Sequence, residues 1–230
     1  MAATLLLRRL GGAVESRSST RTHEDTTRYT LTGVAESRSP RGRARAEAVL
    51  RTLRGVDRSA PPRYRGAMGR VELRDLTDDD LDAVFEMMRD PEAVRMAAFT
   101  AADPDDRDAF NAWIARNRAL EGVLQFVVTE RGGFAGTAAT FNVETDREVT
   151  YWIARHAWGR GVATEALQLL LWREPVRPLR ARVAVHNDAS RHVLEKCGFT
   201  EVSRDSGFAP GVGRIVEEIV YVLMPTPDGN

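Results

Sequence analysis

The chain has 230 residues and carries 33 basic and 33 acidic side chains, so its formal net charge is zero. A chain of this length can form one substantial hydrophobic core with an extension, or two small domains. Its single cysteine excludes an intrachain disulfide, and no stretch approaches the roughly 18 consecutive apolar residues of a transmembrane helix. We therefore expect a reducing compartment and no membrane span.

Residues 1–66 differ from the rest of the chain in charge and composition. They hold 14 arginines against 6 acidic residues, which leaves 19 basic against 27 acidic residues in the remainder. The segment is rich in Arg, Ser, Thr and Gly, so it is predicted to be a disordered extension. Three interpretations stay open: a poorly ordered tail of a cytoplasmic protein with its natural start at Met68, an Arg- and Ser-rich organelle-targeting peptide, or a basic arm for nucleic acid. The shortage of aromatic residues counts against the arm.

A globular domain is predicted over residues 67–226. It opens with a short strand at 71–73, followed by Thr77 and three aspartates, which suit the start of a helix. Apolar residues at helical spacing continue this helix until just before Pro91. We expect an irregular segment over 96–103 and a second helix that begins at Asp105 or Asp106.

The later elements are predicted from runs of β-branched and aromatic residues and from apolar residues at helical spacing. Strands are expected over 124–129, 135–141, 149–154, 181–185, 199–203 and 215–223, and helices over 162–172 and from the cap Asp188 to Gly198. Residues 205–213 hold three glycines and a proline, so we expect a mobile loop that could cover a site. The order βααβββαβαββ predicts an α/β domain with a mixed sheet.

The turn between strand 149–154 and helix 162–172 predicts an anion site. It reads His-Ala-Trp-Gly-Arg-Gly over residues 156–161. A strand, a glycine turn and a helix start direct several unpaired backbone N–H groups at one point, where the helix dipole is positive. A P-loop would need Gly-Lys-Ser/Thr, and a dinucleotide fingerprint would need a glycine where Glu165 stands.

A third interpretation fits better. Trp158-Gly159-Arg160-Gly161-Val162-Ala163 resembles the acetyl-CoA loop of the GNAT superfamily of N-acetyltransferases, Gln/Arg-x-x-Gly-x-Gly/Ala, and departs from it at Trp158. The WGxGxATEAL form, together with Asn187-x-x-Ser190 and the later EKCGF, is similar to the RimJ/RimL-like branch that acetylates the N-termini of ribosomal proteins. This resemblance covers about Val71 to Met224. It implies a mostly antiparallel central sheet flanked by helices and splayed between its two central strands.

The resemblance also implies the site residues. The backbone edge of Trp152, Ile153 and Ala154 would pair with the pantetheine arm of acetyl-CoA, and Asn187 would hydrogen-bond a pantetheine amide. The N–H groups of the turn would hold the pyrophosphate, and Ser190 would lie nearest the thiolate. The acceptor would contact the loop between the first two helices. The cofactor loop comprises Trp158, Gly159, Arg160, Gly161, Val162, Ala163 and Thr164, and the acceptor contacts are Arg95, Met96 and Phe99.

The expected reaction is acetyl transfer from acetyl-CoA to a primary amine, either a protein N-terminus or a small molecule. Glu148 is the preferred general base, with Glu144 as runner-up, and a water chain or a plain surface carboxylate is the alternative. The four histidines lack metal-ligand spacing, so no metal is expected. Two other functions stay open: a non-catalytic acyl-CoA-binding regulatory module, and an acetyltransferase for an antibiotic or polyamine. The sequence leaves open whether the protein is a monomer or a homodimer.

Overall fold

The computed structural model describes Ala2–Ala3 and residues 70–225 of the chain. The predicted disorder of residues 1–66 lies outside the described residues, apart from the two-residue strand β1 (Ala2–Ala3). No helix within the described ranges is long and apolar enough to cross a membrane.

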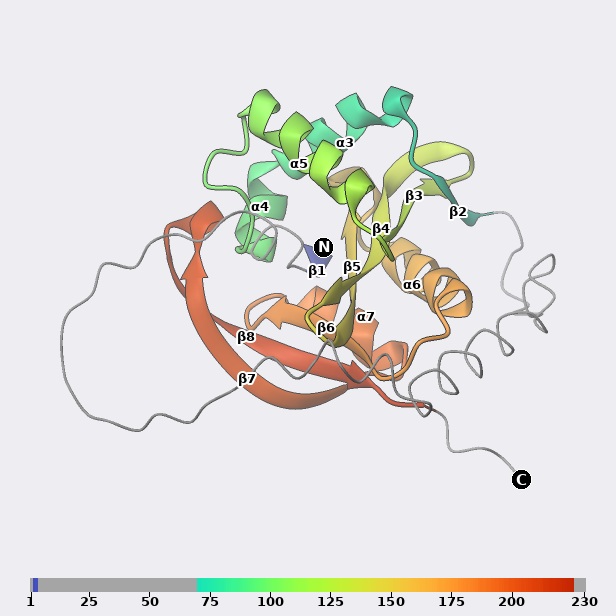
Figure 1. Ribbon diagram of the computed structural model, residues 1–230, viewed down its shortest axis with the longest axis vertical. Helices are drawn as coiled ribbons and strands as arrows, with labels where there is room; N and C mark the ends of the chain where they lie inside the picture. The colour runs from blue at the N-terminus through green and yellow to red at the C-terminus, as the bar shows by residue number, and fades with distance from the viewer. Residues whose placement is uncertain (1, 4–69, 226–230) are drawn as a thin grey trace, which may run out of the picture. The chain divides into compact units, whose positions relative to one another are not determined.

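The centre of the domain is a single sheet in the order β2-β3-β4-β5-β6-β8-β7, and β1 pairs with β5 outside this path (Figure 1). Its strands are β2 (Val71–Asp75), β3 (Leu124–Glu130), β4 (Gly133–Val143), β5 (Asp146–Ile153), β6 (Leu179–Ala184), β7 (Thr200–Ala209) and β8 (Arg214–Leu223). The neighbours along this path pair antiparallel, except for β5 and β6, which are parallel. The expected mixed, mostly antiparallel sheet is therefore confirmed.

The sheet opens between β5 and β6. Only Arg147 and Glu148 of β5 pair with β6, opposite Leu179 and Arg180, whereas β5 pairs with β4 along its whole length. Beyond Glu148 the two strands diverge, so backbone groups of β5 lie next to the gap. The predicted splay between the two central strands is confirmed, and Glu148 stands at its apex.

Helices cover both faces of the sheet. Tyr151 and Ile153 of β5 pack into the core beneath α6 (Val162–Arg173) and α7 (Asp188–Lys196). Trp152 and Ala154 point the other way, into a core with α3 (Leu81–Met88), α4 (Pro91–Ala97) and α5 (Arg107–Ala119). Because side chains alternate between the faces of a strand, Glu148 lies on the face of α3–α5.

Helix α4 was not predicted from the sequence. It begins at Pro91, where only the end of the previous helix was expected. The Asp90 carboxylate accepts hydrogen bonds from the N–H groups of Glu92 and Ala93, at 3.0 and 2.9 Å. An aspartate N-cap before proline is a good helix start, since proline at the first helical position loses no hydrogen bond. The Asp-Pro pair was the missed signal.

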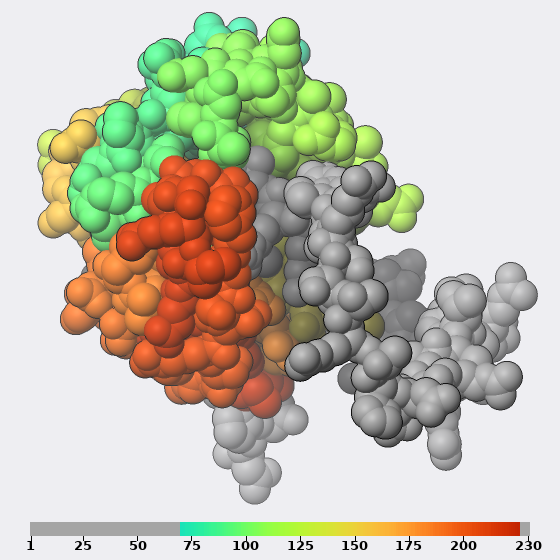
Figure 2. All heavy atoms as spheres, turned by 90° about the vertical axis from the view of Figure 1, so that its left-hand side faces the viewer, coloured from blue at the N-terminus to red at the C-terminus, as the bar shows by residue number. Residues whose placement is uncertain are grey.

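The prediction of a mobile loop over residues 205–213 is wrong. Strand β7 extends to Ala209 and pairs with β8, and the hairpin closes through a short 3-10 helix, Pro210–Val212. Figure 2 shows the red hairpin tip against the green segment that contains α4. A Cβ on Gly211 would stand 2.0 Å from Thr100 Oγ1 and 2.9 Å from the carbonyl oxygen of Ala98. This close packing fixes the hairpin instead of leaving it as a loop.

Candidate functional site

The glycine turn has the geometry of an anion site. Gly159 and Gly161 have φ angles of 73° and 81°, in the left-handed region that favours glycine. Gly161 is the N-cap of α6, and the first α-helical hydrogen bond of α6 runs from the N–H of Glu165 to the carbonyl of Gly161. The N–H groups at positions 162–164 precede that bond, as expected at a helix start. The side chains of Val162 and Ala163 are buried beneath the turn, whereas the glycines are exposed.

Two arginines border this turn, and only one was predicted. Arg160 forms an ion pair with Glu130 at the end of β3. Arg70, which was not predicted, donates to the carbonyl of Arg160 at 2.6 Å and pairs with Glu165. Arg70 precedes β2 and lies 90 residues away in sequence from Arg160, so no local pattern could have indicated the contact. Each arginine is paired with a glutamate, so two ion pairs border the exposed glycines.

The expected pantetheine edge is narrower than the sequence suggested. The N–H of Ala154 donates to the carbonyl of Ala135 in β4, and its C=O accepts from Ala157, each at 2.8 Å. Ala154 therefore has no unbonded backbone group for a ligand. Backbone groups alternate in direction along a strand, so Tyr151 and Ile153 are the residues that face the splay. The indole N–H of Trp158 already donates to the carbonyl of Ile153, at 2.6 Å.

Strand β1 lies on this same edge. Ala2 and Ala3 pair antiparallel with Trp152 and Tyr151. The strand is also close to β6 and to α4, so it lies in the gap between the two central strands. The structure thus shows that the β5 edge can accept an extended backbone, which is how a pantetheine arm is expected to bind.

Ser190 and Asn187 meet at the start of α7. Asn187, and not the expected Asp188, is the N-cap, and its side-chain oxygen accepts from the N–H of Ser190 at 3.1 Å. The Ser190 hydroxyl oxygen lies 2.7 Å from that of Tyr151, which also donates to the Ser190 carbonyl at 3.2 Å. All three side chains are buried. Burial raises the pKa of the Tyr151 phenol, so it keeps its proton at neutral pH.

Tyr151 was missed as a candidate because an aromatic residue in a buried strand is typical of core packing.

Glu148 is almost completely buried, with 2% exposure, and one of its oxygens lies 3.5 Å from Nε of Arg182 in β6. Glu144, the runner-up, is an exposed residue of the turn between β4 and β5. Of the two glutamates, the structure brings only Glu148 to the splay. Arg182 also pairs with Glu218 of β8, at 3.3 Å, and with Asp205 of β7, at 3.6 Å. The sequence did not predict this group of Arg182, Glu218 and Asp205, because the three residues lie on three different strands.

The predicted acceptor contacts do not form one group. Arg95 is an exposed residue of α4 that pairs with Glu92, and Met96 beside it is half-buried. Phe99 has 1% exposure and packs with Ala184 and Val216. Only Phe99 reaches the sheet, close to Glu218.

A family comparison decides what this arrangement is. Residues 70–200 match the model of the acetyltransferase (GNAT) domain. The chain belongs to the GNAT family. It is an acetyl-CoA-dependent N-acetyltransferase. The uncharacterized N-acetyltransferase p20 of Bacillus licheniformis is 22% identical over 165 residues, which cover 67% of this chain and 93% of the relative.

Two solved acetyltransferase structures are similar to this chain. Mycobacterium smegmatis RimJ, in complex with CoA-disulfide, superposes with a TM-score of 0.57 and 24% identity, over 67% of this chain and 81% of RimJ. Ribosomal-protein-alanine N-acetyltransferase from Brucella melitensis superposes with a TM-score of 0.55 and 22% identity, over 67% of this chain and 99% of the other. These likenesses show a shared fold.

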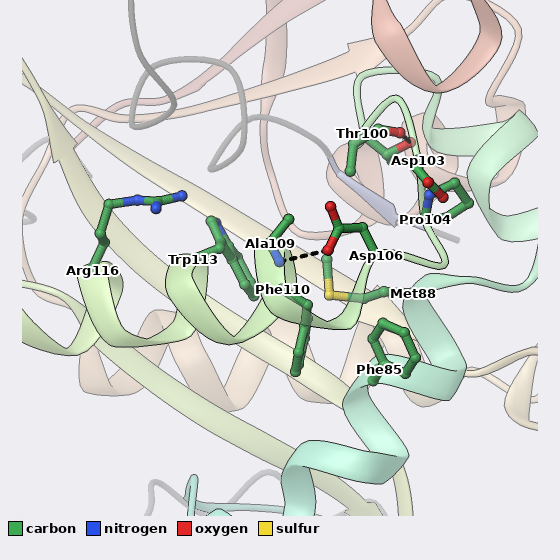
Figure 3. A pocket seen from close by; sticks show the side chains of 11 residues that line it. Phe85, Met88, Thr100, Asp103, Pro104, Asp106, Ala109, Phe110, Trp113 and Arg116 are labelled. Carbon is green, nitrogen blue, oxygen red and sulfur yellow. Dashed lines mark hydrogen bonds between the residues drawn. The ribbon is translucent and has the colours of Figure 1, made fainter.

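The GNAT domain has a further hollow on the face of α3–α5. Its volume is about 130 Å³, and it lies between α3, α5 and the loop that joins α4 to α5 (Figure 3). Met88, Phe110 and Trp113 form an apolar wall, and Asp103 and Asp106 line it as well. The described residues contain no group of three His, Cys, Asp or Glu side chains arranged to hold a metal ion.

Proposed function

We propose that this GNAT protein transfers the acetyl group of acetyl-CoA to a primary amine by direct attack in a ternary complex. One observation carries the proposal: the buried carboxylate of Glu148 stands at the apex of the β5–β6 splay, beside the β5 edge. The carboxylate faces α3–α5, and the Tyr151–Ser190 pair lies on the side of α6 and α7.

The chain's own residues fit acetyl-CoA. The open space at Gly159, where a Cβ would meet nothing within 4 Å, would admit the pyrophosphate. A Cβ on Gly161 would lie 3.5 Å from Nη2 of Arg70 and 3.9 Å from Oε1 of Glu165. The N–H groups at the start of α6 would bind its oxygens, with Arg70 and Arg160 nearby. The backbone of Ile153 and Tyr151 would pair with the pantetheine arm, as β1 does now with Tyr151 and Trp152.

In the proposed reaction, Glu148 takes a proton from the acceptor ammonium, directly or through water. The neutral nitrogen then attacks the thioester carbonyl carbon, a C–N bond forms, and the C–S bond breaks with its electron pair on sulfur. The proton that the attack leaves on the nitrogen passes through water to the departing thiolate, so that CoA leaves as the thiol. The Ser190 hydroxyl, which is hydrogen-bonded to the Tyr151 hydroxyl, would stabilise the negative charge on sulfur by a hydrogen bond and keep its own proton. The products are the acetylated amine and free CoA.

A protein N-terminus is the acceptor we favour. The structural neighbours support a ribosomal protein as the acceptor, since one of them is a ribosomal-protein-alanine N-acetyltransferase and another is RimJ. A small-molecule amine is the second candidate.

The test is a screen of acceptors with acetyl-CoA, in which release of free CoA is measured. Alanine-, serine- and methionine-initiated peptides would be compared with the same peptides blocked at the N-terminus, and with polyamines and aminoglycosides. We expect release with free N-termini and none with blocked ones. Binding of acetyl-CoA without any release would contradict catalysis and favour a regulatory acyl-CoA-binding module.

A further inference from the structure

Charged side chains are buried together on the acceptor side of the sheet, a feature that packing does not require. Glu148 and Glu218 have 2% and 1% exposure, and the side chain of Arg182 between them has 14%. Asp205, which is exposed, also contacts the guanidinium. Three carboxylates therefore surround one guanidinium. The Arg180–Asp146 pair lies beside Glu148 on β6 and β5 and is itself balanced in charge.

Buried ion pairs seldom stabilise a fold beyond what apolar residues of equal volume would give, because both charges lose their hydration. This group is also imperfectly bonded. Nε of Arg182 is buried and has no hydrogen-bond partner among the described residues, although Glu148 lies 3.5 Å away. Natural proteins usually satisfy such donors, so an unsatisfied one calls for an explanation.

The position of the group supplies that explanation. Strand pairing places Glu148 opposite Arg180, at the last point where β5 and β6 are joined. Arg182 is two residues further along β6, where the splay begins, and Glu218 pairs with Ala184 on the same face. Phe99 packs on Ala184 and forms an apolar wall next to Glu218. The two carboxylates thus lie on the α3–α5 face of the sheet, on strands next to the splay through which an acceptor would approach.

We infer that Glu218 is a second acceptor-binding carboxylate, which holds the ammonium form of the amine together with Glu148. This inference rests on the proposed function. An ammonium group has three donors and a positive charge, so it suits two carboxylates that already share one cation. Glu148 would take the proton, while Glu218 would hold the acceptor. Arg182 would keep the carboxylates in place and limit their mutual repulsion.

The acceptor class follows from this arrangement. The site would select amines that are protonated at neutral pH, such as a peptide α-amine, an alkylamine or a lysine side chain. Amines that are neutral at this pH, such as anilines and hydrazides, would gain nothing from Glu218. The role therefore differs from a structural one, which would affect both kinds of acceptor equally.

The experiment measures equilibrium binding by calorimetry at pH 6.5, with CoA present so that no acetyl transfer occurs. One probe is an alanine-initiated tetrapeptide, whose α-amine is mostly protonated at this pH. The other is the same peptide with a lactoyl group, which replaces the ammonium by a neutral hydroxyl. We expect the wild-type protein to bind the ammonium peptide about tenfold more tightly, roughly the factor of one charge-assisted hydrogen bond.

Glu218→Gln should reduce this ratio severalfold and leave CoA binding unchanged. Glu217→Gln is the matched control. The Glu217 side chain is next to Glu218 in sequence, is half-exposed and pairs with Arg204, so this variant should keep the wild-type ratio. An unchanged ratio in a folded Glu218→Gln protein would overturn the inference, as would equal binding, or no binding, of the two peptides by the wild type. If Glu218→Gln does not fold, the same affinity ratio is measured for Glu218→Asp and compared with the wild-type ratio. An unchanged ratio in that variant would overturn the inference as well.

Failure of the proposed function would be visible separately, as a lack of CoA release in the acceptor screen. If the wild-type protein prefers the ammonium peptide over the lactoyl peptide but releases no CoA, the ammonium-binding site is supported and the proposed catalysis is contradicted.

Discussion

Glu148 occupies its place because of strand register. A shift of one residue in β5 would turn this side chain to the opposite face, toward α6 and α7. The observed register pairs Glu148 with Phe141 on β4 and with Arg180 on β6. It therefore places the carboxylate at the splay, a result that the sequence alone left open.

If Glu148 is the general base, Glu148→Gln should lower kcat by about 10²-fold at pH 7 and keep the affinity for acetyl-CoA. The loss should shrink as pH rises toward the pKa of the acceptor amine, because the amine then loses its proton to water. Glu144→Gln in the exposed turn is the control and should behave as the wild type. Normal turnover of Glu148→Gln at pH 7 would favour a water chain instead.

The substitution Gly161→Val tests whether the glycine turn binds the pyrophosphate. A valine at φ 81° would be strained, and its side chain would occupy the space above the turn. Gly213→Val is a suitable control, since Gly213 also has a positive φ, 64°, and open space around it. We expect both variants to lose similar stability, of the order of 1–2 kcal/mol, but only Gly161→Val to lose acetyl-CoA binding. Equal acetyl-CoA affinities of the two folded variants would remove the anion-site argument.

The hydrogen bond between Tyr151 and Ser190 predicts that the two residues act as one unit. Tyr151→Phe and Ser190→Ala should each lower kcat, and the double variant should be little worse than the poorer single variant. Acetyl-CoA affinity, measured by calorimetry, should hold in all three. Effects that multiply in the double variant would show that the two hydroxyl groups act independently of each other.

At the scale of elements, local signals were sufficient to predict the glycine turn before α6 and insufficient to predict the contacts around Glu148. Helix α6 and its glycines could be predicted because strand, turn and helix follow one another within about 25 residues. The Arg182–Glu218 contact joins β6 to β8, and the Arg70–Glu165 contact joins the start of β2 to α6. Such contacts depend on sheet order and register, which a single sequence does not encode in any local pattern.

Strand β1 leads to a prediction about residues 1–66. Ala2 and Ala3 pair with Trp152 and Tyr151, on the edge expected to bind pantetheine, so the segment should compete with acetyl-CoA. We expect deletion of residues 1–66 to lower the KM for acetyl-CoA severalfold. The melting temperature should change little, since a two-residue strand buries little surface.

Ala3→Pro in the full-length chain is the matched variant, because proline removes a backbone donor from the pairing. It should lower the KM in the same direction. An unchanged KM in both proteins would show that β1 does not compete with acetyl-CoA, and a melting temperature lower by several degrees on deletion would show that the segment belongs to the core.

At the scale of the whole molecule, the order of the reaction is decided by what the chain offers as a nucleophile. A double-displacement mechanism would need a side chain that carries the acetyl group between two half-reactions. Cys197 is the only cysteine of the chain. It lies at the end of α7, where burial raises the pKa of its thiol to about 11. The thiol is therefore protonated at neutral pH, and the thiolate is the form that attacks.

The protonated thiol supports the proposed ternary complex, in which the amine and acetyl-CoA would meet in the splay. Initial rates measured against both substrates should give intersecting lines in double-reciprocal plots, and Cys197→Ser should keep kcat within about twofold, because a buried thiol that does not ionise contributes only to packing. Parallel lines, together with an acetylated protein trapped before the amine is added, would contradict direct attack. If Cys197→Ser also lost that acetyl group, Cys197 would be the acetyl carrier, and Glu148 would act in the second half-reaction only.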